Sequence, residues 1–283
     1  MHGEVHCAVE STASANFAAH SEVHPAMKSF IRGCAAASVL VLAGCAAPTS
    51  LPDALAFQQP SSGPPGTPLR VLALTATAGF RHDSIPVARQ TLQTLAAANG
   101  FTVTLTENPG DLNATTLAAT EVVVFLLTSG ELAFDAAQKA AIVSFVERGG
   151  GFVGMHSATD TLYDWPDYGR IVGAYFKEHP WTQEATVVVE DRAHAATRDL
   201  GASLRLFEEY YTFRENPRPS VQVLLSLDAA SVGASGDFPL SWSQTIGQGR
   251  SFYTALGHFE STWTDTRFRT HVAGAIRWAG RRE

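Results

Sequence analysis

Cysteine is scarce in this chain and is confined to its first part. The 283 residues include three cysteines, Cys7, Cys34 and Cys45, and none follows Cys45. A domain without cysteine cannot form a disulfide, hold zinc through thiolates or use a thiol as its nucleophile. These three kinds of site are therefore excluded from everything beyond residue 45.

Positive charge is also in short supply. The chain has 20 Lys and Arg against 27 Asp and Glu, a net charge of −7, and no long basic run. A protein that binds nucleic acid needs a basic stripe to neutralise phosphates, so no nucleic-acid partner is expected. The apolar share of 45% excludes a chain that is disordered throughout.

No apolar run is long enough for a membrane-spanning helix. The apolar stretch at residues 33–42 is too short to cross the ~30 Å hydrocarbon core of a bilayer, and it follows the basic residues Lys28 and Arg32. It ends in Leu-Ala-Gly-Cys45, which resembles a bacterial lipobox. This pattern predicts a lipoprotein signal peptide at residues 27–44 and lipidation of Cys45. The alternative interpretation is a buried, Ala-rich helix.

The lipobox also predicts where the protein resides and how the remaining N-terminal residues behave. We expect a lipid-anchored protein of the bacterial periplasm or cell envelope, touching the membrane through its anchor only. Residues 1–26 contain no Lys or Arg, unlike the start of a signal peptide, so translation is expected to begin at Met27 and the upstream piece to be an artefact of the reading frame. Residues 45–68 are rich in Pro, Ser and Gly and predict a flexible linker.

The remaining residues, 69–283, alternate between strand and helix patterns. Short apolar runs predict strands at 69–74, 101–106, 121–127 and 152–155, and amphipathic segments predict helices at 84–99, 134–148 and 265–281. Further β-rich segments follow at 185–190, 204–213, 221–227, 240–243 and 251–255. We therefore predict an α/β domain, with a parallel sheet, helices on both faces and added β segments in the C-terminal half.

Histidines follow three of the predicted strands. His82 comes after the first strand, His156 after the fourth and His258 after the last. Ligands of an open parallel sheet bind outside the carboxyl ends of its strands, so these histidines are expected to form one site. Neutral imidazoles are ligands for divalent metals, and the three are candidates to hold such an ion. A single histidine at such a place is more often a loop or helix-cap residue.

His156 occupies a distinctive turn. Gly154 lies two residues before it in the stretch GGGFVGMHSA, as in a strand-to-helix elbow that exposes one side chain above a sheet. No G-x-S-x-G motif occurs in the chain, so an esterase triad would lack its nucleophile. Asp160, four residues on, is predicted to lie on the same helical face as His156 and to orient it. Ser157 is predicted to be a helix N-cap.

A second polar group lies farther along the chain. It contains His179 and the run Glu208-Glu209-Tyr210-Tyr211. Neighbouring residues of a strand point to opposite faces, so at most one of the two glutamates reaches the site. The alternative for either glutamate is an ion pair with Arg214 or Arg218.

Five blocks of residues, in order, resemble the ThuA-like family, named for trehalose utilisation. They are FRHDSI at 80–85, GGGFVGMHSATDT at 149–161, YGRIVGAYFKEHP at 168–180, EEYYTFRENPR at 208–218 and GRSFYTALGHFESTW at 249–263. The resemblance implies a flavodoxin-like fold similar to that of class I glutamine amidotransferases. His156 stands where those enzymes have their nucleophilic cysteine, so glutaminase activity is not expected.

The resemblance also implies a carbohydrate context, with disaccharide catabolism alongside sugar oxidoreductases and 3-keto-glycosides as substrates. We therefore expect an enzyme, a lyase or hydrolase, that cleaves such a sugar or keto-sugar by acid/base chemistry. His156, Asp160 and Glu209 are the predicted catalytic residues. The predicted substrate-binding residues are Arg81, His82, His179, Tyr210 and His258.

Two other functions remain open at this point. One is a non-catalytic carbohydrate-binding or scaffold lipoprotein, whose aromatic side chains stack on sugar faces. The candidates for stacking are Phe80, Trp165, Tyr168, Trp181, Tyr210, Tyr211 and Trp263. The other is an ordinary glycoside hydrolase that uses Asp160 and Glu209 as its two carboxylates.

Overall fold

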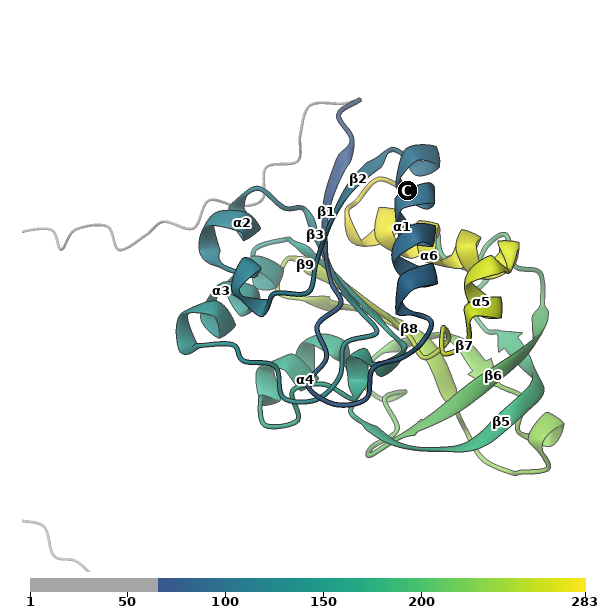
Figure 1. The fold of residues 1–283 in the computed structure, drawn as a ribbon. Helices are drawn as coiled ribbons and strands as arrows, with labels where there is room; N and C mark the ends of the chain where they lie inside the picture. The colour runs from purple at the N-terminus through teal and green to yellow at the C-terminus, as the bar shows by residue number, and fades with distance from the viewer. Residues whose placement is uncertain (1–65) are drawn as a thin grey trace, which may run out of the picture. The chain divides into compact units, whose positions relative to one another are not determined.

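The computed structural model describes residues 66–283, and these form one nine-stranded sheet with helices packed on it (Figure 1). Across the sheet, the strands lie in the order second, first, third, fourth, ninth, eighth, seventh, fifth and sixth along the chain. The predicted upstream segment, signal peptide, lipidation site at Cys45 and nearly all of the linker lie outside the described residues. Within residues 66–283, no helix is both long and apolar enough to cross a membrane.

Five strands form the parallel half of the sheet. They are β1 (Leu69–Leu74), β2 (Phe101–Thr106), β3 (Val122–Leu126), β4 (Gly151–Met155) and β9 (Gly249–Thr254). Every residue of β3 and β4 is buried, which accounts for their apolar sequences, because helices cover a central parallel strand on both faces. The predicted α/β fold with a parallel sheet is confirmed.

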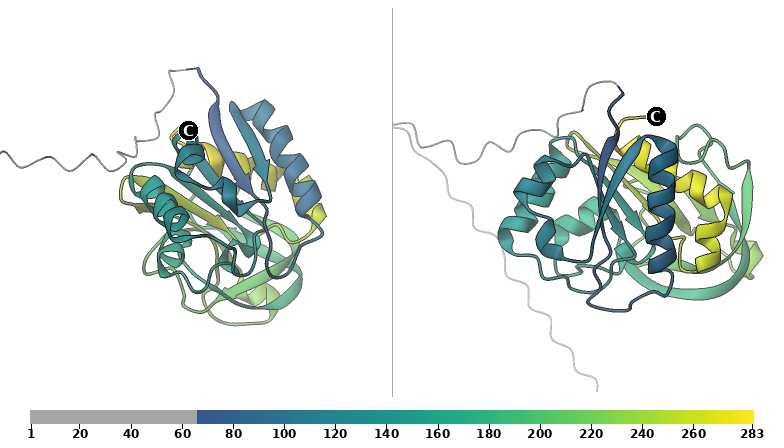
Figure 2. Two further views of the ribbon diagram at one scale, coloured as in Figure 1. Left: turned by 60° about the vertical axis from the view of Figure 1, so that its left-hand side comes forward. Right: turned by 45° about the horizontal axis from the view of Figure 1, so that its top comes forward.

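Helices cover both faces of this parallel half (Figure 2). One face carries α1 (Ile85–Asn99), α5 (Glu260–Thr264) and α6 (Thr266–Ala279), and the other carries α2 (Ala114–Ala118), α3 (Ala136–Glu147) and α4 (Pro166–Val172). Local signals set their ends. Helix α1 is capped at its C-terminus by Gly100, whose φ of 71° suits glycine, and α3 begins with a capping box between Asp135 and Gln138.

The added β segments of the C-terminal half form the antiparallel part of the same sheet. They are β5 (Phe176–Val189), β6 (Ser203–Phe213), β7 (Gln222–Leu227) and β8 (Pro239–Ile246). Strand β5 begins at Phe176 rather than at residue 185. Its first half is mostly polar and exposed, and it is a strand because it pairs with β6, which no local apolar pattern reveals.

The hairpin of β5 and β6 curls toward the carboxyl ends of the parallel strands. Strand β6 is the outermost strand, with β8, β7 and β5 between it and β9. Register shifts interrupt the pairing of β5 with β6 near Glu178 and that of β7 with β8 near Leu225. Such irregularities bend a sheet and increase its twist. Figure 1 shows β5 and β6 sweeping beneath the parallel half, at the end where the strands finish.

Candidate metal centre

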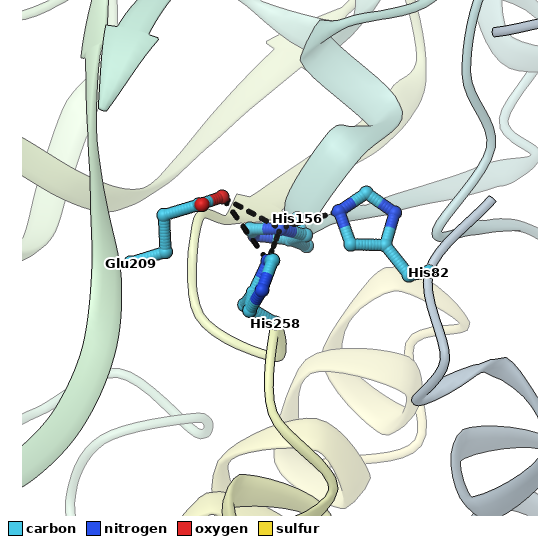
Figure 3. A group of neighbouring side chains, drawn as sticks. All are labelled: His82, His156, Glu209 and His258. Atoms are coloured by element: carbon cyan, nitrogen blue, oxygen red, sulfur yellow. Dashed lines mark hydrogen bonds and ion pairs between the residues drawn. The ribbon is translucent and has the colours of Figure 1, made fainter. Parts of the chain in front are cut away.

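Four side chains from distant parts of the sequence meet at the carboxyl ends of the parallel strands (Figure 3). His82 follows β1, His156 follows β4, Glu209 lies on β6, and His258 follows β9. Each offers a nitrogen or oxygen atom, and these four atoms lie within 4.8 Å of one another. We call these four residues the His–Glu cluster.

His156 projects from a strained turn directly after β4. Its φ of 51° lies in the left-handed region, which a residue with a side chain adopts at a cost of about 1 kcal/mol or more. Gly154 makes the turn possible, since a Cβ there would lie 3.2 Å from both the Cβ of Ala158 and the ring of Tyr253. The predicted turn is thus present, but it leads into a 3₁₀ turn instead of an α-helix, and the imidazole at its tip is buried instead of exposed.

A backbone carbonyl determines the tautomer of His156. Its Nδ1 lies 2.7 Å from the carbonyl oxygen of Ala255, which only accepts hydrogen bonds, so Nδ1 carries the proton and donates it. The other nitrogen, Nε2, is then unprotonated and points into the cluster. Metal-binding histidines are commonly oriented in this way, by a hydrogen bond from the nitrogen that does not bind the metal.

Several polar atoms crowd the free nitrogen of His156. Nε2 lies 3.0 Å from Nε2 of His82, 3.2 Å from Nδ1 of His258 and 3.0 Å from the hydroxyl of Tyr211. One lone pair accepts one good hydrogen bond, so three close partners exceed what it can satisfy. The nitrogen–nitrogen distances are close to the ~3.3 Å expected between two ligands of a tetrahedral zinc ion. The cluster therefore fits a divalent metal.

Burial keeps two of the imidazoles neutral. It lowers the pKa of His82 to about 4, with the charge of His258 adding to the effect, and it lowers the pKa of the fully buried His156 well below its usual value. For His258, burial also acts to lower the pKa, but the hydrogen bond and charge of Glu209 outweigh it and raise the pKa. Neutral imidazoles are the form that binds metal.

Glu209 joins the cluster to a further histidine. Its Oε2 lies 3.1 Å from Nδ1 of His258 and 3.6 Å from Nε2 of His156, and its Oε1 lies 3.2 Å from Nδ1 of His179. The side chain of Glu209 is only 11% exposed, whereas that of His179 is 48% exposed. His179 thus stands beside the cluster on its solvent side.

Glu208 is fully buried and supports the cluster from behind. Its carboxylate accepts hydrogen bonds from the backbone amides of Gly257 at 2.8 Å, His258 at 3.3 Å and Glu209 at 3.0 Å, and from the hydroxyl of Thr262 at 2.5 Å. Neither glutamate pairs with Arg214 or Arg218, so the alternative of a surface ion pair is wrong for both. Arg214 lies over the ring of Tyr163, and Arg218 pairs with other acids.

Besides His179, three of the predicted site residues lie outside the cluster. Asp160 follows a 3₁₀ turn at His156–Thr159, not an α-helix, so it is not on the face of His156; its carboxylate accepts a hydrogen bond from Tyr163. Arg81 pairs with Glu107 at 3.1 Å. Tyr210 is buried on the other face of β6 and donates to the carbonyl of Leu206. Ser157 lies inside the turn rather than capping it.

Tyr211, which the sequence suggested only as a stacking residue, instead contacts the cluster. Its hydroxyl reaches His156, and its ring packs against that imidazole with a centroid distance of 4.4 Å. The signal was present in the sequence, because residues two apart on a strand share a face. If Glu209 faces the site, Tyr211 must face it as well, and Tyr210 must not.

The comparisons with known proteins agree with this fold. A family model described as ThuA, trehalose utilisation, matches residues 70–279. A ThuA-like protein from Bacteroides uniformis is 25% identical and has a TM-score of 0.66, over 78% of this chain and 95% of that one. Another from Parabacteroides merdae is 19% identical with a TM-score of 0.62, over 76% and 90%. A search of the curated proteins found no match.

Proposed function

The chain belongs to the ThuA family of trehalose utilisation, and we propose that it cleaves keto-glycosides at a divalent metal ion held by the His–Glu cluster. The family relates to carbohydrate utilisation. The observation that carries the proposal is the convergence of three imidazole nitrogens and one carboxylate oxygen within 4.8 Å. A set of nitrogen and oxygen ligands of this kind is typical of zinc and related transition-metal ions.

The proposed reaction is an elimination. A divalent ion held by the His–Glu cluster would supply a Lewis acid for a ketone oxygen of the substrate. A base removes the proton from the carbon between the ketone and the glycosidic carbon. The electron pair of that bond forms a carbon–carbon double bond, the glycosidic C–O bond breaks, and the proton passes to the departing oxygen.

We assign the proton transfer to His179. Its Nδ1 faces Glu209, which leaves Nε2 without a partner among residues 66–283 and free to take or give a proton. The ring is half-exposed and stacks on Phe176, with a centroid distance of 5.9 Å. His156, by contrast, is fully buried with both nitrogens engaged, which suits a ligand better than a base that meets substrate.

The lipobox and the family resemblance also support a proposal for the setting of the reaction. We place the enzyme in the bacterial cell envelope, anchored by lipid at Cys45. A sugar oxidoreductase in the same pathway would supply the substrate, because oxidation of a secondary hydroxyl creates the ketone that the elimination needs.

The test compares variants of the three cluster histidines with a histidine elsewhere. His82→Ala, His156→Ala and His258→Ala are assayed for metal content, melting temperature with and without added Zn²⁺ or Mn²⁺, and cleavage of a 3-keto-glycoside. His194→Ala is the control, since His194 is nearly buried but remote from the cluster. We expect metal to raise the melting temperature of the wild type and the control. Each cluster variant should lose that shift and about 10²-fold or more of its turnover.

The same experiment decides between an enzyme and a binding protein. If turnover survives a chelator and persists in all three variants, the metal-dependent reaction is wrong. If the wild type binds sugar but turns over no keto-glycoside, the non-catalytic carbohydrate-binding reading replaces it.

A further inference from the structure

Two large hydrophobic side chains are exposed among residues 66–283, and both lie near the His–Glu cluster. The side chain of Phe80 is 64% exposed and that of Phe207 is 53% exposed. A single exposed apolar residue is ordinary and needs no explanation. These two exposed rings need an explanation because they lie on either side of the cluster.

Phe80 and Phe207 form the two ends of a continuous row of rings. Phe80 packs against His82 at a centroid distance of 4.8 Å, and His82 lies 5.1 Å from His258. His258 in turn lies 4.5 Å from Phe259, which lies 5.2 Å from Phe207. The two inner histidines belong to the cluster. An exposed phenyl ring therefore stands at each end of the row, with the candidate metal centre between them.

Each of the two rings projects from well-anchored backbone. The carbonyl of Phe80 accepts a hydrogen bond of 2.6 Å from the hydroxyl of Ser129. The loop before Phe80 packs closely on Gly130, because a Cβ on Gly130 would lie 2.5 Å from the backbone nitrogen of Gly79. Phe207 is paired with Glu184 within the β5–β6 hairpin. It is also two residues before Glu209, so its side chain is on the face of β6 that forms the cluster.

Most other aromatic candidates for stacking on a sugar are unavailable. Of the residues selected from the sequence, Trp165, Tyr168, Tyr210, Tyr211 and Trp263 are buried. Trp181 is half-buried and packs on Phe238. Among those candidates only Phe80 is largely exposed. Phe207, which the sequence did not suggest, is the second exposed ring.

We propose that Phe80 and Phe207 are two stacking subsites, and that the ligand is a glycoside with two rings, one on each phenyl group and the glycosidic bond over the cluster. This inference rests on the proposed function, because it specifies the substrate of the same site. The shared chemistry is a flat ring with an apolar face, which a second sugar or an aryl group would provide equally well.

Calorimetry of ligand binding tests the inference without needing turnover. The full-length protein is titrated with three ligands. Methyl α-glucoside has one sugar ring, phenyl α-glucoside has a sugar ring and an aryl ring, and trehalose has two sugar rings. We expect tighter binding of a two-ring ligand than of the methyl glucoside. F80A and F207A should each weaken binding of that ligand roughly 3- to 10-fold, the range of a ring–ring contact. The two-ring ligand that binds more tightly identifies the second ring.

Matched variants and metal content separate this inference from the proposed function. F80Y and F207Y keep the rings and should keep the affinity, and all four variants should keep the wild-type metal content and melting temperature. If neither two-ring ligand binds the wild type, the inference is wrong. It is also wrong if F80A and F207A bind the two-ring ligand as tightly as the wild type does. If binding depends on both rings but no keto-glycoside is cleaved, the subsites stand and the proposed reaction falls.

Discussion

Glu208 links the backbones of two residues of the His–Glu cluster through a single carboxylate. It accepts hydrogen bonds from the backbone amides of both Glu209 and His258, which lie on different strands or loops far apart in the sequence. Residues that hold metal ligands in place typically account for 10–100-fold of metal affinity. A side chain that touches neither metal nor substrate therefore matters for the site.

We predict that Glu208→Gln weakens metal binding about 10- to 100-fold. The Gln side chain has one acceptor oxygen in place of two, and its NH₂ group would face backbone N–H donors. Some of these buried backbone amides would then lose their hydrogen-bond acceptor, at a cost of about 1–3 kcal/mol. A competition titration with a chromophoric chelator measures the affinity, and urea unfolding measures the stability.

The control for this prediction is Glu184→Gln. Glu184 lies on the neighbouring strand β5, is more than half exposed and pairs with Arg205 on the surface, where the loss should be small. Equal metal affinity in Glu208→Gln and the wild type would contradict the supporting role of Glu208.

At the scale of elements, helix α6 packs on the sheet through a buried histidine that lies apart from the cluster. His271 donates from Nδ1 to the carbonyl of Ala196 at 2.9 Å, and its Nε2 lies 3.4 Å from the hydroxyl of Ser241. Burial lowers its pKa to about 4, and the nearby His194 adds to this effect. The folded protein therefore keeps this imidazole neutral under mildly acidic conditions in which the unfolded chain protonates it.

This difference predicts that the fold weakens as the pH falls from about 6.5 to about 4. In that window the unfolded state binds a proton at His271 and the folded state does not, so the free energy of unfolding falls by up to ~1.4 kcal/mol per pH unit. Urea unfolding between pH 7.5 and 4.5, with chelator present, measures the slope. His271→Asn keeps a donor near the position of Nδ1 for Ala196 but cannot be protonated, so its slope should be shallower. Identical slopes would show that His271 does not contribute.

At the scale of the whole molecule, the two halves of the sheet make one site only because the sheet bends. The parallel half supplies His82, His156 and His258 at the ends of its strands, and the antiparallel half supplies Glu209 from its outermost strand. Because β6 is separated from β9 by three strands, a flat sheet would hold Glu209 roughly 19 Å away, at about 4.8 Å per strand. The contact of 3.1 Å between Glu209 and His258 therefore depends on the curl of the β5–β6 hairpin.

The location of the whole molecule remains a prediction from its N-terminal sequence. We expect Cys45→Ser to abolish labelling with a radioactive fatty acid and to leave the precursor unprocessed, because Cys45 is the expected lipidation site. Cys34→Ser is the matched control, since it changes a cysteine inside the predicted signal peptide and should leave labelling intact. Labelling that persists in Cys45→Ser would contradict the lipoprotein assignment.

Much of the parallel half was predictable because its signals are local. Buried strands such as β3 are continuous apolar runs, and helix ends carry recognisable caps such as Gly100. The carboxyl ends of parallel strands share one edge, so the positions of His82, His156 and His258 in the sequence were enough to predict that they meet. The ThuA-like blocks added the fold family, which the family match over residues 70–279 confirms.

The sequence by itself thus determined the fold class, the elbow at His156 and the meeting of three histidines, because each depends on short-range patterns and a general rule of sheet geometry. Only the tertiary structure decided that Glu209 and Tyr211 face the cluster while Glu208 and Tyr210 do not. It also decided that Asp160 bonds to Tyr163 and stays outside the cluster, and that Phe80 and Phe207 end one row of rings. Those outcomes depend on how far the β5–β6 hairpin curls and which of its faces turns inward, and long-range packing sets both.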